Sequence, residues 1–513
     1  MSVVVESAEV AIGDIRPDPP RRGHRWSGVP FAVVAVVARL LIIRLPLTPD
    51  EGGYLLAASQ WHHGTSTYGA YFVDRPPLLM AIYGLADLLG GALALRLIGV
   101  VAAAVAVLIA GRIAGRVGAV AATVFVVTPL FGTTNVDGEL LALPFVLGGL
   151  LALLRAVDPV ERRSGHPALY GGALAMAGLL VKQDMVDVFV AAAALSVVLV
   201  IHRRRRDAVA LSIQGAAGAL VTAGAALVLA WIRGTSPVRL WDALVTFRLQ
   251  AGSVISANGS SAGATTERLH TMLQALALSG APLVALVAVL TAGRPTLGFT
   301  GDRSRALDLR WVGLPVLAWE IVGALLGGSY WLHYLIALIP GLVLLLAAVP
   351  QRSGQSWGWG RQRLVAGTLV VAGISASVAF VDVLAHQPGL SSDARISAYL
   401  SAHRRAGDTV VVAFGHPNIV YDAGMTSPYE HLWSLSARVR DPRLSDLTTT
   451  MTGPQPPHWI VVAGASLGSW GIEATAAQQV LLQHYRPVTT DGDWHVFEHN
   501  PSPATRASTL ARG

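Results

Sequence analysis

The stretch "LPLTPDEGGYLLAASQW" at residues 45–61 follows the first long apolar run of the chain. It places Asp50 and Glu51 side by side at the point where the first helix is expected to leave a lipid bilayer. The four residues "TPDE" have the pattern of a helix start, because Thr48 can act as N-cap and Glu51 can close a capping box. A structural role therefore accounts for Glu51 better than for Asp50, and Asp50 is the stronger candidate for chemistry.

The composition indicates a polytopic membrane protein. Of the 513 residues, 53% are hydrophobic and only 13% are charged, and the mean hydropathy is +0.53, whereas a soluble protein carries about a quarter charged residues. Apolar runs of about 16 to 24 residues recur through the first three quarters of the chain, long enough to cross a hydrocarbon core of about 30 Å. Cysteine is absent from the sequence, which excludes disulfides and thiolate metal sites.

Arginines cluster in the short loops between apolar runs, and the formal net charge is +7. This pattern indicates membrane topology rather than nucleic-acid binding, and the positive-inside rule puts these loops and the N-terminus in the cytoplasm. The candidate spans lie at 29–45, 93–111, 118–134, 139–155, 167–181, 186–201, 208–232, 270–293, 311–327, 331–349 and 363–384. The segments that face outward are then 46–75, 132–138, 182–185, 233–269, 327–331 and everything after about 385.

The sequence predicts three parts: a cytoplasmic tail at 1–28, a membrane domain at 29–385 and a small extracytoplasmic α/β domain at 386–513. The membrane domain is expected to be an all-α bundle of about 11–13 transmembrane helices. Its outward parts include a first loop at 46–75 and a long loop at 233–269. We expect this multi-pass chain in the plasma membrane of a bacterium.

Strand and helix patterns alternate in the last part of the chain. Short apolar runs at 408–414, 458–464 and 494–499 predict strands, and amphipathic patterns at 392–405 and 472–484 predict helices.

Two segments of the membrane domain are expected to differ from simple spans. Residues 76–90 form a short apolar piece that contains Asp87. Because residues 76–111 must make a net single crossing of the membrane, this piece is expected to lie in the interface or to dip only partly into the bilayer. Residues 256–267, "SANGSSAGATTE", are predicted to be a flexible loop that could order over a bound ligand.

The outward turns hold most of the unusual polar side chains, and we expect these side chains to converge at one end of the bundle. Polar groups at membrane depth are costly and tend to mark functional sites. The candidates are Asp50, Glu51, Asp74, Arg75, Asp137, Glu139, Lys182, Gln183, Asp184, Asp187, Tyr330 and His333. Lys182 is the only lysine of the chain.

Several candidates also have a structural interpretation. Asp137 can N-cap the helix that starts at Gly138, Lys182 can snorkel to the interface, and His333 can belong to an aromatic belt with its neighbours. Arg75 can pair with a nearby acid. However, the two prolines that follow Arg75 place it at a rigid corner beside the membrane, where a guanidinium suits a phosphate group.

The order of these motifs resembles that of the C-type (GT-C) membrane glycosyltransferases. It is similar to the family 39-like branch of protein O-mannosyltransferases and lipid A aminoarabinose transferases. The resemblance covers residues 29 to about 350 and rests on the acid after the first helix, the "RPPL" corner at 75–78, the acid of the next outward turn, "GLLVK" at 178–182 and "SYWLHYLIALIP" at 329–340.

The resemblance implies a polyprenyl-phosphate sugar as donor and a hexosyl, pentosyl or aminosugar transferase activity. It assigns the catalytic base to Asp50 or Glu51, the second acid to Asp137 with Glu139 as the alternative, and phosphate binding to Arg75 and Lys182. The family often has lysine where this chain has Arg75. A divalent metal, Mg²⁺ or Mn²⁺, is left open, and Asp50 and Asp137 would be its ligands.

The remaining site predictions concern substrate contacts. Arg248, in the predicted helix "LWDALVTFRLQ", would add positive charge for the donor phosphate. An apolar groove beside 76–90 would hold the polyprenyl tail. Residues expected to contact substrate are Glu139, Gln183, Tyr54, His62, His333 and Tyr330. The aromatics Tyr54, Trp61, Tyr68 and Tyr71 would either stack on sugars or anchor the chain at the interface.

The predicted function is transfer of a sugar to an acceptor hydroxyl on the outer face of the membrane, with inversion of the anomeric centre. The acceptor can be a protein, a lipid or a cell-wall glycan. Membrane lipids are also expected to bind, whereas nucleic acid is not an expected partner. The alternatives are a lipid-linked glycan polymerase or ligase, a polytopic transporter, and a sensor.

Overall fold

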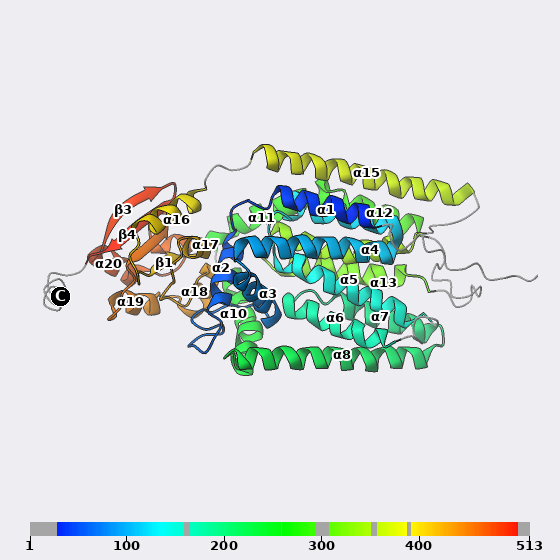
Figure 1. Ribbon diagram of the computed structural model, residues 1–513, viewed down its shortest axis with the longest axis horizontal. Coiled ribbons are helices and arrows are strands. Elements are labelled where there is room, and N and C mark those ends of the chain that lie inside the picture. Colours follow the sequence, from blue (N-terminus) through cyan, green and yellow to red (C-terminus); the bar gives the residue numbers. More distant parts are fainter. Residues whose placement is uncertain are drawn as a thin grey trace, which may run out of the picture.

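The computed structural model describes residues 28–158, 165–257, 259–292, 307–349, 356–386 and 391–500. These residues form a long helical bundle and a smaller domain with a β-sheet, which packs against one end of the bundle (Figure 1). The predicted tail at 1–28 lies outside the described residues except for Gly28. We call the end of the bundle that contacts the smaller domain the domain-facing end.

Apolar helices form the bundle, and they coincide with the predicted spans. They are α1 (Val29–Leu41), α4 (Ala92–Val127), α5 (Gly138–Ala156), α6 (Pro167–Val181), α7 (Asp187–Ile201), α8 (Arg205–Ile232), α11 (Gly259–Leu278), α12 (Ala281–Thr291), α13 (Arg310–Leu326), α14 (Ile339–Ala347) and α15 (Ser356–Ala385). The predicted span at 331–349 begins with the 3-10 helix η6 (Leu332–Leu338) and continues as α14.

Helix α4 contains two of the predicted spans, because it is broken at Ala114 and Gly115. Gly115 has φ +63°, in the left-handed region that glycine adopts readily. A Cβ atom on Gly111 would lie 3.3 Å from the Cβ of Ala119, whereas residues eight apart in one straight helix are about 12 Å apart. The chain therefore reverses direction at the break, as predicted for 93–111 and 118–134.

Among the described residues, four helices are long and apolar enough to cross a membrane, and a bent pair, Thr265–Leu278 with Ala281–Thr291, makes five if it is one span. Shorter apolar helices of 10–17 residues complete the bundle. Large apolar side chains remain exposed on these helices, including Leu220 at 71% and Val378 at 66%. Such surfaces suit contact with lipid, and the chain is a multi-pass membrane protein.

Short helices cover the domain-facing end. They are α2 (Pro49–Ser59), α3 (Pro77–Leu88), η2 (Pro129–Phe131), α9 (Pro237–Trp241), the π-helix η4 (Asp242–Thr246) and α10 (Phe247–Ala257). The predicted flexible loop at 256–267 is wrong for the described residues, because α10 ends at Ala257 and α11 begins at Gly259. Gly and Ser lower helix propensity by at most about 1 kcal/mol each, and α11 packs against η2 and η6.

The smaller domain has a four-stranded sheet with the order β1-β2-β4-β3. Strands β1 (Val410–Ala413) and β2 (Trp459–Ala463) are parallel, and β4 (Trp494–His499) runs antiparallel to β2 and to β3 (Tyr485–Asp491). Its helices are α16 (Ser392–His403), α17 (Pro417–Asp422), α18 (Ser434–Arg440), α19 (Ser445–Thr452), the 3-10 helix η7 (Leu467–Trp470) and α20 (Thr475–His484). The predicted strands and helices of this domain are present. Strand β3 was not predicted, because it is a half-exposed edge strand that contains Pro487.

Candidate active site

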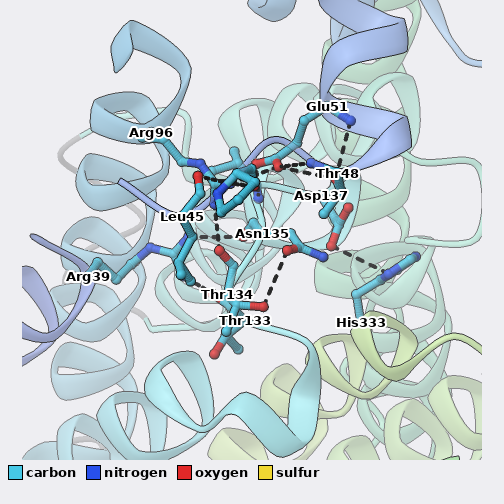
Figure 2. Close-up of polar contacts among 12 residues, drawn as sticks. Arg39, Leu45, Thr48, Glu51, Arg96, Thr133, Thr134, Asn135, Asp137 and His333 are labelled. Carbon is cyan, nitrogen blue, oxygen red and sulfur yellow. Dashed lines mark hydrogen bonds and ion pairs between the residues drawn. The ribbon is translucent and has the colours of Figure 1, made fainter. Parts of the chain in front are cut away.

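Glu51 joins three segments of the domain-facing end. The predicted capping box is present: the Thr48 backbone N–H donates to Glu51 Oε2 (3.0 Å), and the Glu51 N–H donates to the Thr48 hydroxyl. Arg96 Nη2 of α4 donates to the same carboxylate oxygen at 2.9 Å (Figure 2). The Val136 N–H donates to Oε1 at 2.8 Å. Glu51 is fully buried and both its oxygens are engaged. This geometry argues against the prediction that Glu51 is a catalytic base.

Two buried arginines that the sequence analysis missed fix the turn before α5. Arg39 Nη1 donates to the Thr133 carbonyl at 2.6 Å, and its Nη2 donates to the Asn135 carbonyl at 2.9 Å. Arg96 donates to the Thr134 carbonyl in the same turn (Figure 2). The sequence could have indicated both residues, because each is an arginine inside an apolar run. A charge at that depth is costly unless it has partners.

Asp50 is half-buried, in the first turn of α2, and its partner comes from the smaller domain. The indole Nε1 of Trp433 donates to Asp50 Oδ1 at 2.9 Å. Asp50 also lies close enough to Arg75 and Asp137 for its charge to act on both. This is consistent with the prediction that the three residues lie in one region of the protein.

Asp74 forms ion pairs with both arginines that were predicted to bind phosphate. Arg75 Nη1 contacts Asp74 Oδ1 at 2.8 Å, and Arg248 Nη2 of α10 contacts Asp74 Oδ2 at 2.8 Å. Gln183 Nε2 donates to the Asp74 backbone carbonyl at 3.1 Å, and this hydrogen bond connects the turn after α6 to the same group of residues. Burial raises the pKa of Asp74, but Arg248, Arg75 and Lys182 outweigh it and hold the pKa below its usual value. Asp74 thus remains charged among cations.

The arginine at the proline corner is firmly cationic. Burial lowers the pKa of Arg75, but Asp74, Tyr54 and Asp50 outweigh this effect and hold the pKa well above its ordinary value. The Tyr68 hydroxyl donates to the Arg75 backbone carbonyl at 2.7 Å and fixes the corner.

A second ion-pair group lies between α5, the turn after α6, and η6. Lys182 Nζ contacts Glu139 Oε1 at 2.8 Å and lies 5.0 Å from the centre of the Tyr334 ring. His333 Nδ1 lies 3.4 Å from Asp137 Oδ2, and its Nε2 lies 4.0 Å from Glu139 Oε1. Burial lowers the pKa of Lys182, but Glu139 and Asp184 outweigh it and the pKa is raised overall.

Asp137 occupies the N-cap position of α5 but makes no side-chain cap hydrogen bond. Its Oδ2 is buried without a hydrogen-bond partner and faces His333 (Figure 2). Burial raises the pKa of Asp137 to about 7; His333 acts against this rise, and Glu139, Glu51 and Asp50 add to it. The capping interpretation therefore does not explain Asp137, whose carboxyl group can change protonation near neutral pH.

Other predicted contact residues do not present free surfaces at this site. Tyr54 is 5% exposed and packs between Tyr83 and Trp433, with ring centres 5.3 Å away in each case. Trp61, Tyr68 and Tyr71 are also buried. Sugar stacking by these four aromatics is therefore not supported, because all four are buried in the main hydrophobic core.

Two further predicted residues also differ from expectation. His62 is exposed, and the backbone of its turn at residues 62–63 lies close to Gly234, at the start of the 233–269 segment. Tyr330 is half-buried and packs against the main hydrophobic core. His333 is thus the member of the predicted aromatic turn that contacts the acidic residues.

Three acids of this site already have side-chain partners, and Asp137 is one of the two metal ligands that the resemblance left open. Asp137 faces His333, Glu139 pairs with Lys182, and Asp74 pairs with two arginines. Within the described ranges, no group of three or more His, Asp or Glu side chains could hold a metal ion. We therefore assign no step of the reaction to a metal.

A solved structure resembles this one over almost its whole length. It is ArnT from Cupriavidus metallidurans bound to undecaprenyl phosphate, with a TM-score of 0.61 and 16% sequence identity, covering 94% of this chain and 99% of that chain. At this identity the likeness shows the fold, which is the GT-C fold predicted from the sequence. No curated protein sequence matches the chain.

The sequence pattern of the bundle gives the class of protein. Residues 74–231 match the family model for dolichyl-phosphate-mannose-protein mannosyltransferase. The protein is a multi-pass membrane glycosyltransferase with the GT-C fold. The matched segment agrees with the resemblance to the family 39-like branch that the sequence shows, and it includes Arg75, Asp137 and Lys182.

Proposed function

We propose that this protein transfers a sugar from a polyprenyl-phosphate donor to a hydroxyl group of an acceptor, and that Asp50 is the general base. The observation that carries the proposal is the grouping of three cations, Arg75, Arg248 and Lys182, around Asp74 and Glu139 beside Asp50. Each of these cations is paired with a carboxylate, and a phosphate group can form charge-assisted hydrogen bonds to the same guanidinium and ammonium groups.

The surface beside this cluster suits an isoprenoid chain. Helix α3 follows the Arg75 corner directly. It exposes Leu85 at 51% and Leu88 at 77%, and Leu89 just after its end is 66% exposed. A polyprenyl tail along α3 would put its phosphate at Arg75. Binding of undecaprenyl phosphate by the structurally similar ArnT supports this class of donor.

The reaction follows from the charges. Asp50 accepts the proton of the acceptor hydroxyl as the hydroxyl oxygen attacks C1 of the sugar. The bond between C1 and the phosphate oxygen breaks, and its electron pair stays on the phosphate. Arg75, Arg248 and Lys182 stabilise the charge that develops there. Attack opposite the leaving group inverts the anomeric centre.

The membrane orientation is also part of the proposal. The arginine-rich loops, including 203–206, would lie in the cytoplasm by the positive-inside rule. The domain-facing end and the smaller domain would then lie outside the plasma membrane, where a protein, lipid or cell-wall glycan can serve as acceptor. A transporter or sensor offers no reason for the cluster of cations at one end of the bundle.

The test compares Asp50→Asn with Asp382→Asn, a control at an exposed aspartate of α15. Purified protein is incubated with polyprenyl-phosphate sugars and candidate hydroxyl acceptors, and sugar transfer is measured. Asp50→Asn should lose roughly 10²- to 10⁴-fold in turnover, the usual contribution of a general base, while Asp382→Asn keeps wild-type turnover. Wild-type turnover in Asp50→Asn would refute the base assignment.

A further inference from the structure

The smaller domain reaches into the candidate active site through Trp433. This residue precedes α18, and its indole N–H donates to Asp50 Oδ1 at 2.9 Å, across 383 positions of sequence. Its ring also packs on Tyr54, one helical turn after Asp50, with 5.3 Å between ring centres. The hydrogen-bond partner of the proposed base thus comes from outside the helical bundle.

Two glycines of α2 allow this approach. A Cβ atom on Gly53 would lie 2.4 Å from the Trp433 ring and 2.5 Å from Pro417, and one on Gly52 would lie 2.5 Å from Asn418 Cα. All three distances are shorter than real Cβ contacts. The "GG" that follows the two acids in the sequence therefore lets α17 and Trp433 pack directly on the backbone of α2.

The segment before Trp433 is attached to the 46–75 loop. The Ser427 N–H donates to the Tyr71 hydroxyl at 2.9 Å, and the Phe72 N–H donates to the Glu430 carbonyl at 3.2 Å. Ser66 also donates to the Glu430 carboxylate. These bonds fix the path of residues 427–433 and hold the indole at the carboxylate.

A general base must present one oxygen to the substrate in a fixed direction, because a misplaced catalytic group loses rate steeply. An aspartate has two equivalent oxygens and can rotate. A donor on one oxygen fixes the rotation and leaves the other oxygen to accept the proton.

We propose that Trp433 is a positioning residue for Asp50, and that the smaller domain is part of the catalytic unit. This inference rests on the proposed function, in which Asp50 is the base. It assigns to the smaller domain a role in turnover besides any contact with the acceptor.

The experiment uses Trp433→Phe in the full-length protein, which keeps an aromatic ring and removes the N–H donor. Trp494→Phe is the matched control, because Trp494 lies in the same domain and its Nε1 donates to Asp393 Oδ1 at 3.0 Å. Turnover, the KM for a polyprenyl-phosphate sugar, the pH–rate profile and the melting temperature are measured for both variants.

Trp433→Phe should lower kcat about 10-fold, the effect of losing one hydrogen bond to a charged group, and leave the donor KM unchanged. The acidic limb of its pH–rate profile should move to higher pH, since the ionised carboxylate loses a donor. Arg75, Asp137, Tyr54 and Tyr83 are titratable groups whose charges interact with that of Asp50, and all are retained. Trp494→Phe should behave as wild type.

Wild-type kcat and an unshifted pH profile in Trp433→Phe would overturn the inference. Equal losses in both variants, following their melting temperatures, would also overturn it, because they would indicate domain stability alone. Asp50→Asn separates this outcome from failure of the proposed function: if that variant is inactive while Trp433→Phe is fully active, only the positioning role falls.

Discussion

Asp50 and Glu51 are neighbours in sequence, yet they have different environments. Glu51 points into the bundle, where Arg96, Thr48 and the Val136 N–H engage its two oxygens. Asp50 points toward Trp433 and the cations. Successive residues of a helix lie about 100° apart around its axis, so one turn can present one acid to the core and the other to the site.

This difference predicts that Glu51→Gln mainly destabilises the protein. The substitution leaves the buried Arg96 guanidinium without its counter-charge, and breaking such a pair costs about 3–5 kcal/mol. Thermal unfolding in detergent should therefore show a much lower melting temperature for Glu51→Gln than for Asp50→Asn. A stable but inactive Glu51→Gln protein would instead support the catalytic role that the geometry argues against.

At the scale of elements, α2 is the part that connects the bundle to the smaller domain. Its first turn carries the acids, and its next residues are the glycines against which α17 and Trp433 pack. A glycine in a helix lowers stability by about 1 kcal/mol relative to alanine. The two adjacent glycines are accounted for by this close contact.

Gly53→Ala should therefore displace Trp433 and lower kcat at least as much as Trp433→Phe does. Gly224→Ala in α8 is the control, because a Cβ atom there would meet nothing within 4 Å. We expect the control to keep full activity and to gain slightly in stability. Sugar transfer and melting temperature check both variants, and an active Gly53→Ala protein would contradict the close packing.

At the scale of the whole molecule, the two parts lie along one axis, with the candidate site where they meet (Figure 1). The 46–75 loop, the turns before α5 and after α6, α10 and η6 all contribute to that site. The proposed topology places this junction outside the membrane and the loop at 203–206 in the cytoplasm.

The absence of native cysteine makes this topology directly testable. Single cysteines are placed at two exposed positions, Asp493→Cys in the smaller domain and Arg206→Cys in the first turn of α8. Intact cells are then treated with a membrane-impermeant maleimide. We expect labelling of Asp493→Cys alone, and labelling of both after the cells are opened. The reverse pattern would mean that the site faces the cytoplasm.

The local sequence was sufficient for much of this protein. Apolar run lengths predicted the spans, the "TPDE" pattern predicted the start of α2, and alternating apolar runs predicted three of the four strands of the smaller domain. Charged residues in outward turns predicted the grouping of Arg75, Lys182, Arg248 and Asp137. These features depend on hydrophobic burial, capping and the cost of charge in lipid, which act within short stretches of chain.

Only the tertiary structure decided which acid is engaged in packing and which one lies at the site. The pairing of Glu51 with Arg96, the burial of the four aromatics and the contact of Trp433 with Asp50 join residues that are far apart in sequence. Periodicity and propensity carry no information about such partners, because the partners depend on how whole elements pack. The sequence therefore determined the spans, the start of α2 and the candidate charges, whereas packing decided the environment and the contacts of each charge.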